Sequence, residues 1–514
     1  MAAIVTDQFR IANANNFIDS VLNSNNSYYV FLGLSNPGSV NNPIGFGRTT
    51  YWDDSPSVPP NPIDNQQYLS HYRDTMLFGN KITSSNIRRV IRKVTWTANT
   101  RYDMYRHDYS SLNLTPNAKT ARLYDSNYYV INSDFKVYVC ISNGSSGDNL
   151  LGNTSKDEPT FTDLEVSAAG NSGDGYIWKY LFTISPSDIV KFDSTEYIVL
   201  PNDWETSTDF QIQNIRESGD SSINNNQIKT VYIEDGGSSY TSKIYDIIGD
   251  GVGAQVSIEC DSTGKIVNTT VVSGGSGYTY GIVDLESFGT VSSPAKLIPI
   301  IPPSRGHGYD IYSELGADRV LVYSRFDDST KDFPSDTKFA QVGIIKNPQK
   351  YSSSSIYDNN TYTSLGSIKV SSVTSNPAVG DEISQVVTGG TAKGYVASYD
   401  IETKVIKYYQ DRSLYFANNQ NQIDRNDVSS KGKVLNFESS SEDILPVGGS
   451  VDIGYSGITT TIGSKQVSLN VTFNQGLANP EINKSTGDVI YIDNRSLITR
   501  DSRQKEDVKI ILEF

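Results

Sequence analysis

The sequence predicts a mainly β, multidomain protein with a few α-helices, and three observations support this fold class. The length of 514 residues suggests about three or four domains. Short runs of alternating apolar and polar residues recur along the chain, separated by turns rich in Gly, Asn, Pro and Ser. The chain also has 33 Tyr against 4 Trp and 3 Met, and tyrosine suits half-buried strands and large wet interfaces.

The N-terminal part begins with a predicted helix at residues 6–23, which Thr6 or Asp7 can cap. Its expected apolar stripe consists of Phe9, Phe17, Ile18, Val21 and Leu22. A strand rich in aromatic and branched residues should follow at 27–34, and a second helix at 67–78. Between them, residues 35–65 carry many Pro, Asn and Gly, which predicts an ordered loop or docking arm.

The most informative segment is GDGYIWKYLFTISPSDIVKFDSTEYIVL at 173–200. A Gly-Asp-Gly turn leads into a strand with one aromatic face, formed by Tyr176, Trp178, Tyr180 and Phe182 together with Ile184. Ser185 then caps a helical turn that has Pro186 at its first position and runs to about Phe192. A second strand follows at 196–200. This pattern is typical of a structural core, because it presents no exposed nucleophile or ligand cluster.

The charge of the chain argues against nucleic acid or an anionic membrane as the main partner, since the net charge is −15 and the isoelectric point is near 4.8. Arg88, Arg89, Arg92 and Lys93 alternate with apolar residues, so we expect a strand or short helix with a solvated face. Cys140 and Cys260 predict free thiols in a reducing compartment. No apolar run approaches a membrane span, and residues 1–25 lack the features of a signal peptide, so we expect a soluble, unsecreted protein.

The segment 96–109 combines aromatic residues with Arg101, Arg106 and His107. A catalytic interpretation would use His107 beside Asp103 or Asp108. No nucleophile elbow or metal-ligand spacing supports it, so the sequence favours a structural loop with cation–π contacts. Strands are expected within 126–142, and 143–172 should be a polar surface loop.

Two small β-modules are predicted in the middle of the chain. In 223–285, the motif GGSSYT at 236–241 recurs as GGSGYT at 274–279, each copy after an apolar strand. A Gly-Val-Gly at 251–253 has no following helix or lysine that would make it a phosphate cradle. Residues 366–409 suggest a barrel-like unit. The chain ends in strands at 488–492 and 508–514 around a charged turn.

Seven motifs then give a specific resemblance. They are AIVTDQFRIANANNF, TRYDMYRHDY, GDGYIWKYLFTI, EYIVLP, QVGIIKNP, GDVIYIDNR and VKIILEF, in this order. Together they resemble the baseplate wedge protein family encoded by gene eight of T4-like contractile-tailed phages. With its extra β-modules, the chain resembles the longer type of this family seen in cyanophages. The resemblance covers roughly residues 1–205, a short piece near 340–350 and the last 30 or so.

The resemblance implies a mostly β fold with β-sandwich-like domains and with both termini in one domain. It implies a structural, non-enzymatic protein of the virion tail baseplate that assembles in the host cytoplasm, forms a homodimer and contacts other wedge proteins. It implies no catalytic, cofactor-binding or metal-binding residues. The expected domains are a terminal α/β domain of 1–125 with 481–514, a β-sandwich-like domain at 126–222, an inserted repeat module at 223–285, a family-type β region at 286–365, and inserted barrel-like modules at 366–480.

Two other function classes are compatible with the residues. A receptor-binding adhesin would use the Tyr-, Asn- and Gly-rich β-modules to bind glycans. A polysaccharide-degrading enzyme would need a placed pair of carboxylates. With 58 Asp and Glu in the chain, composition alone does not exclude such a pair.

Overall fold

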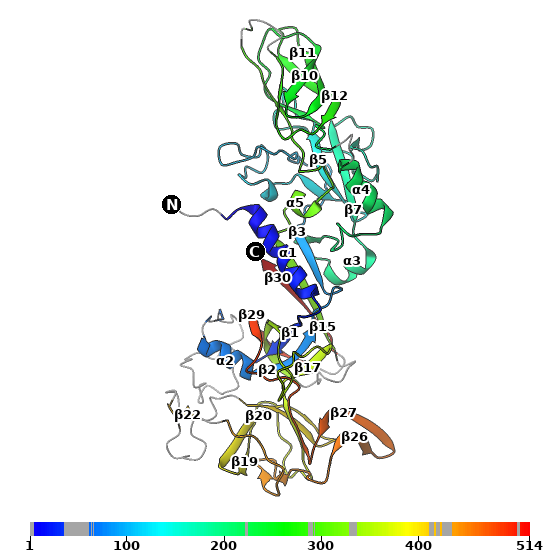
Figure 1. The fold of residues 1–514 in the computed structure, drawn as a ribbon. Helices are drawn as coiled ribbons and strands as arrows, with labels where there is room; N and C mark the ends of the chain where they lie inside the picture. The colour runs from blue at the N-terminus through cyan, green and yellow to red at the C-terminus, as the bar shows by residue number, and fades with distance from the viewer. Residues whose placement is uncertain are drawn as a thin grey trace. The chain divides into compact units, whose positions relative to one another are not determined.

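The computed structural model describes residues 5–34, 61–62, 64, 66–220, 225–285, 291, 293–327, 337–410, 416–417, 422–423, 434–500 and 504–514. The chain forms two compact units. Unit 1 comprises Met1–Ile18, Arg88–Leu321 and Ile510–Phe514, and unit 2 comprises Asp19–Ile87 and Val322–Lys509. Antiparallel sheets dominate both units (Figure 1), which confirms the predicted fold class. Residues 5–18 and 510–514, near the two ends of the chain, both belong to unit 1.

Helix α1 (Asp7–Leu22) lies where the sequence predicts it, and the Thr6 hydroxyl accepts the Phe9 N–H at 3.3 Å. The buried stripe differs from the predicted one. It consists of Ile11, Ala14, Ile18 and Val21, whose spacing follows the helical repeat. Phe9 and Leu22 were expected in the stripe and are instead 59% and 45% exposed.

The centre of unit 1 is a four-stranded sheet in the order β4-β5-β7-β6. Its strands are β4 (Tyr129–Ile131), β5 (Lys136–Asn143), β6 (Ser167–Ala168) and β7 (Tyr176–Thr183). The predicted aromatic face of β7 is confirmed, because Tyr176, Trp178, Tyr180 and Phe182 are all buried. Lys179 and Leu181 on its other face are buried too. Strand β7 is therefore covered on both sides.

The segments after β7 also match the prediction. The Ser185 side chain accepts the N–H of Asp188, and Pro186 begins α3 (Pro186–Phe192). Strand β8 (Tyr197–Val199) follows and pairs with β3 (Ile87–Arg92) in a sheet of order β30-β15-β3-β8, which also contains β15 (Arg319–Phe326) and β30 (Glu506–Glu513). Short helices connect the strands elsewhere: η1 (Leu123–Asp125), α4 (Phe210–Asp220) and α5 (Ile311–Glu314).

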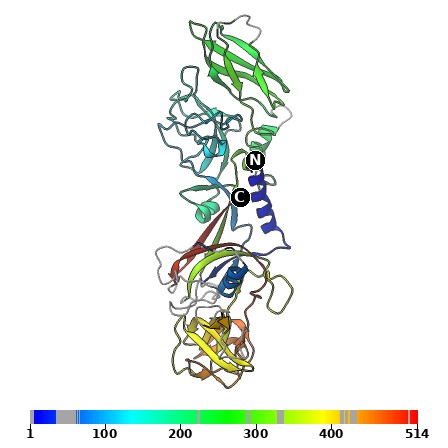
Figure 2. The same ribbon diagram turned by 90° about the vertical axis from the view of Figure 1, so that its left-hand side faces the viewer.

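The repeat module has its own apolar core. Strands β10 (Lys243–Gly249), β11 (Val252–Cys260), β12 (Ile266–Ser276) and β13 (Gly281–Val283) form a sheet of order β12-β11-β10-β13, while β9 (Val231–Asp235) pairs with β14 (Lys296–Pro299). Side chains from both sheets share one core. In Figures 1 and 2 the four-stranded sheet lies at the end of unit 1 beyond β5 and β7.

The duplicated motif of this module has a structural role. The second glycine of each copy has a positive φ, 59° at Gly237 and 60° at Gly275. Each motif tyrosine is buried, and its hydroxyl accepts a backbone N–H: Tyr240 from Ala295 at 3.0 Å, and Tyr278 from Ala254 at 3.1 Å. Each copy is thus a glycine turn that inserts a tyrosine into the shared core.

Unit 2 contains a five-stranded sheet of order β17-β2-β1-β16-β29. Its strands are β1 (Tyr28–Gly33), β2 (Met76–Lys81), β16 (Lys338–Lys346), β17 (Thr361–Thr363) and β29 (Asp488–Thr499). Two predictions are wrong here. The helix expected at 67–78 is α2 (Gln66–Asp74), and the chain then enters β2. The charged turn expected after residue 492 is largely strand, because β29 continues to Thr499, which pairs with Lys338.

The remaining part of unit 2 is a second five-stranded sheet of order β19-β20-β21-β18-β28. Its strands are β18 (Gly366–Lys369), β19 (Glu382–Val387), β20 (Gly390–Asp400), β21 (Val405–Tyr409) and β28 (Leu477–Ala478). Phe437, Ile444, Val447 and Val451 complete its core from outside 366–409. The short pairs are β22 (Phe416–Ala417) with β23 (Gln422–Ile423), β24 (Asp443–Ile444) with β25 (Gly449–Ser450), and the hairpin of β26 (Gly457–Ile462) with β27 (Lys465–Phe473).

Candidate functional site

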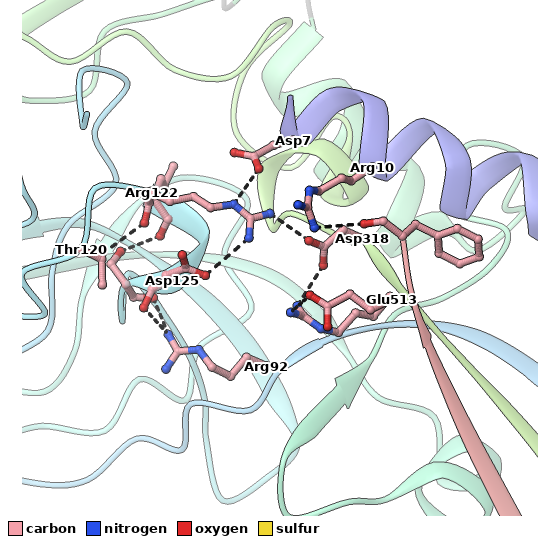
Figure 3. Close-up of polar contacts among 12 residues, drawn as sticks. Asp7, Arg10, Arg92, Thr120, Arg122, Asp125, Asp318 and Glu513 are labelled. Carbon is pink, nitrogen blue, oxygen red and sulfur yellow. Dashed lines mark hydrogen bonds and ion pairs between the residues drawn. The ribbon is translucent and has the colours of Figure 1, made fainter. Parts of the chain in front are cut away.

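A polar junction joins the two chain ends in unit 1, and Arg122 is at its centre (Figure 3). Arg122 Nε lies 2.6 Å from Asp7 Oδ1, Nη2 lies 2.8 Å from Asp318 Oδ2, and Nη1 lies 3.5 Å from Asp125 Oδ1. Burial lowers the pKa of Arg122, but the hydrogen bond to Asp318 and the charge of Asp7 outweigh it, so the pKa lies above its usual value. Asp318 is only 1% exposed. Arg122 therefore compensates a buried charge, and losing it would be costly.

The same junction fixes the C-terminal segment. Arg319 Nη1 lies 2.9 Å from Asp318 Oδ1, and its Nη2 lies 2.8 Å from Glu513 Oε1. The Phe514 N–H donates to the Asp318 carbonyl at 3.1 Å, while Arg10 Nη1 donates to the Phe514 carbonyl at 3.2 Å. Helix α1, β15 and β30 are thereby held together by charged hydrogen bonds, which are stronger than neutral ones.

A second polar cluster is buried beneath α5. His307 Nδ1 lies 2.6 Å from Glu314 Oε1, and the Gly308 N–H donates to Glu314 Oε2 at 2.7 Å. The Tyr105 ring packs edge-on against the His307 ring with centroids 4.9 Å apart, and burial raises the pKa of the Tyr105 hydroxyl. Both carboxylate oxygens are therefore engaged within the fold, which is typical of a structural acid.

Lys179 is an unusual buried cation on β7. It is 4% exposed, and its Nζ donates to Ser218 Oγ at 3.0 Å and to the Leu164 carbonyl. Burial lowers its pKa to about 8. The adjacent cavity, lined in part by Lys179 and His307, measures about 20 Å³. This space holds about one water molecule, not a substrate. The sequence pattern did not indicate a role for Lys179, although a lysine inside an aromatic strand is unusual.

The structure does not bring His107 and a carboxylate into a catalytic pair. His107 Nδ1 accepts the Ile301 N–H at 3.2 Å, and burial lowers the pKa of the ring. Asp103 accepts the backbone N–H groups of Asn117 and Ala118 at 2.9 and 3.0 Å. His107 Nδ1 and both Asp103 carboxylate oxygens are therefore already engaged in structural hydrogen bonds.

Arg106 and Asp108 form the cation–π-laced loop that the sequence predicts. Arg106 Nη2 lies 2.7 Å from Asp108 Oδ2, and its guanidinium lies 4.0 Å from the Tyr232 ring centroid. Arg106 is 2% exposed. The predicted structural loop is confirmed, and it packs against the repeat module through Tyr232.

The basic residues of β3 and the adjacent Lys93 are paired within unit 1. The predicted strand is confirmed, but its expected solvated face is wrong. Arg88 Nη2 lies 2.8 Å from Asp188 Oδ1, and Lys93 Nζ lies 3.1 Å from Asp193 Oδ1. Arg89 is 5% exposed, with its guanidinium 4.1 Å from the Tyr312 ring centroid. The residues of β3 form no exposed basic patch.

The glycines at 251–253 are not a phosphate cradle. Gly251 lies between strands β10 and β11, Gly253 lies within β11, and a Cβ on Gly251 would come within 2.4 Å of the Tyr278 ring. The glycine therefore makes room for the buried tyrosine.

Two larger cavities occur in unit 2. One measures about 400 Å³ and has Asp74 as the only carboxylate in its described lining, among residues such as Tyr408, Phe437 and Asn483. The other measures about 380 Å³ and has Asp64 as its only described carboxylate. Neither described lining contains the carboxylate pair that glycoside hydrolysis uses.

Within the described part of the chain, no three His, Cys, Asp or Glu side chains are grouped closely enough to hold a metal ion. The helices in the described ranges are all too short or too polar to cross a membrane.

These observations define a class: a multidomain β-scaffold whose conspicuous polar side chains hold its own segments together. Residues 152–235 match a family described as Bacteriophage T4, Gp8. The chain is 27% identical over 223 residues to baseplate wedge protein gp8 of Enterobacteria phage T4, and the match covers 39% of this chain and 60% of that protein. The chain thus spans about three fifths of the length of this relative. The predicted resemblance to the gp8 family of baseplate wedge proteins is confirmed.

Proposed function

We propose that this chain is a structural component of the tail baseplate wedge in a contractile-tailed phage, where it links neighbouring wedge proteins. The similarity to the T4 baseplate wedge protein carries this proposal. The matched segment 152–235 encloses β7, α3 and β8. The similarity therefore falls on the buried centre of unit 1, which is the part a shared scaffold would retain.

The geometry supports a non-enzymatic role. Among the described residues, three groups that could serve catalysis are engaged in the fold: Glu314 by both oxygens, Asp103 by two backbone N–H groups, and His107 by the Ile301 N–H. Such fixed contacts suit a scaffold, because a scaffold must hold neighbouring proteins in place without changing its own fold.

Several finer features belong to this proposal. The chain forms a homodimer within each wedge, with an interface of roughly 2,000 Å² or more. It is a longer, cyanophage-type member that enters the virion after assembly in the host cytoplasm. The chain is divided into the five domains expected from its sequence, and the modules at 223–285 and 366–480 are insertions among them. The polar loop at 143–172 and the arm at 35–65 are docking segments, and most of the arm lies outside the described residues.

Affinity purification of the tagged chain from infected cells tests the proposal. We expect the chain to co-purify with other baseplate wedge proteins. A tagged variant carrying Trp178→Ala is a matched control, because removing a fully buried indole from β7 should cost about 3–5 kcal/mol and abolish co-purification through loss of the fold. Recovery of the folded chain free of every wedge protein would contradict the proposed function.

A further inference from the structure

One outward face of the repeat module is both apolar and solvent-exposed. Ile244 and Ile248 on β10 are 49% and 51% exposed, and Tyr280 and Ile282 at β13 are 61% and 64% exposed. Ile248 and Ile282 are direct partners in the β10–β13 register. The intervening residues Tyr245, Ile247 and Val283 are buried in the module core. Strand alternation therefore places the four exposed side chains on the opposite face, with Asp246 between Ile244 and Ile248. We call the four exposed side chains the outer apolar face.

Scattered exposed apolar residues are ordinary on protein surfaces, but a contiguous group usually marks an interaction site. The core of the module does not need these four side chains, because a complete inward-facing set already fills it. These four side chains are therefore available for a contact outside the module.

The outer apolar face also carries acidic side chains. Asp246 is exposed between Ile244 and Ile248 on β10, where it accepts a hydrogen bond from Gln255 Nε2 at 2.8 Å, and Asp250 follows just after the strand. The side-chain hydrogen bond from Thr279 is the main cause that lowers the Asp250 pKa to about 2, so this carboxylate stays charged.

The nearby lysines do not pair with these two carboxylates. Lys265 bonds to Asp148 at 2.6 Å. The Lys243 ammonium lies 5.2 Å from the ring centroid of the inward-facing Tyr245. The exposed face thus combines apolar side chains with negative charge.

We propose that the outer apolar face docks a different protein, whose contacting surface is apolar and carries Lys or Arg. The inference rests on the proposed function, since the occupant is another protein of the particle. A second copy of the same face would bring Asp246 and Asp250 against their own equivalents, because a two-fold interface repeats one patch on both sides. Nucleic acid and anionic lipid would also be repelled. A protein surface that is both apolar and basic would complement the exposed apolar side chains and the negative charge of the face.

Photo-crosslinking in assembled particles tests the inference. Tyr280 is replaced by p-benzoylphenylalanine in the full chain, the particles are irradiated, and adducts are identified by mass spectrometry. We expect one main adduct, with a different particle protein, at a site flanked by Lys or Arg. Leu112 is 97% exposed in a loop of unit 1, and the same probe placed there is the matched control. It should not give this adduct.

A charge variant adds a second readout. Asp246→Lys should lower the adduct yield per incorporated chain by about tenfold, since it would place like charges together. An adduct between two copies of the chain, no adduct at Tyr280, the same adduct from Leu112, or an unchanged yield in Asp246→Lys would each overturn the inference. A chain present in particles without the adduct refutes only the inference, whereas a chain absent from particles refutes the proposed function as well.

Discussion

Replacing Arg122 by methionine should destabilise unit 1, and the structure gives the expected size of the effect. Breaking a buried ion pair by removing one partner typically costs about 3–5 kcal/mol, because the remaining charge is left uncompensated. Asp318 is 1% exposed, but it keeps Arg319 at 2.9 Å after the change. The Arg122 side chain is itself 26% exposed. We therefore expect a loss of about 2–3 kcal/mol in the free energy of unfolding.

Lys229→Met is the matched control for Arg122→Met. Lys229 Nζ lies 2.8 Å from Glu165 Oε2 in the same unit, but the Glu165 side chain is 59% exposed. Exposed pairs contribute about 0–1 kcal/mol to stability, so Lys229→Met should lower the free energy of unfolding by no more than about 1 kcal/mol. Equal losses in the two variants would refute the claim that burial of the acid makes the junction costly to break.

Tryptophan fluorescence during urea unfolding measures this effect, because Trp96, Trp178 and Trp204 all lie in unit 1. A double-mutant cycle with Asp318→Asn isolates the pair from other consequences of each change. We expect a coupling free energy of about 1–3 kcal/mol between Arg122 and Asp318. A coupling below about 0.5 kcal/mol, which is within additivity error, would contradict the assignment of the junction as a cooperative unit.

Three further predictions concern local structure. Ser185→Ala removes the cap of α3 and should cost about 1 kcal/mol in urea unfolding, whereas Ser185→Asp should keep most of the stability. Gly275→Ala should lower the free energy of unfolding more than Gly173→Ala. Both glycines have a positive φ, but only a Cβ on Gly275 would meet a backbone oxygen, at 2.4 Å. Equal losses of stability in the two variants would contradict the steric explanation. Lys179 has a folded-state pKa lowered to about 8, so its charge opposes folding below pH 8, and this penalty disappears as the pH rises toward the unfolded value of 10.5. Relative to Lys179→Met, the wild-type protein should gain on the order of 3 kcal/mol between pH 7 and 10.5, and a flat difference would contradict the burial argument.

Local signals explain why the sequence predicted β7, α3 and β8 well. The aromatic alternation, the Ser-Pro start and the short apolar run each depend on neighbouring residues, and burial followed the pattern. Strand β2 was missed for the opposite reason. Residues Met76–Lys81 are strand because they pair with β1 on one side and β17 on the other, and nothing in their own composition indicates those partners.

The junction around Arg122 was not predictable from the sequence, because its members come from distant parts of the chain. Asp7, Arg122, Asp318 and Glu513 show no common motif or spacing. Their association depends on contacts that form only when α1, β15 and β30 come together in the folded chain. The paired state of Arg88 and Arg89 was missed similarly, since alternation with apolar residues predicts a strand but not which acids and rings lie opposite its charged face.

Removing the chain from the phage tests its proposed role in the baseplate most directly. The gene is deleted, the intact chain is supplied from a plasmid as the control, and purified tails and baseplates are compared by electron microscopy and quantitative mass spectrometry. We predict that the chain is present in complemented baseplates, and that without it baseplates and attached tails fail to assemble while heads still form. Complete, infectious tails lacking the chain would contradict a structural role in the wedge.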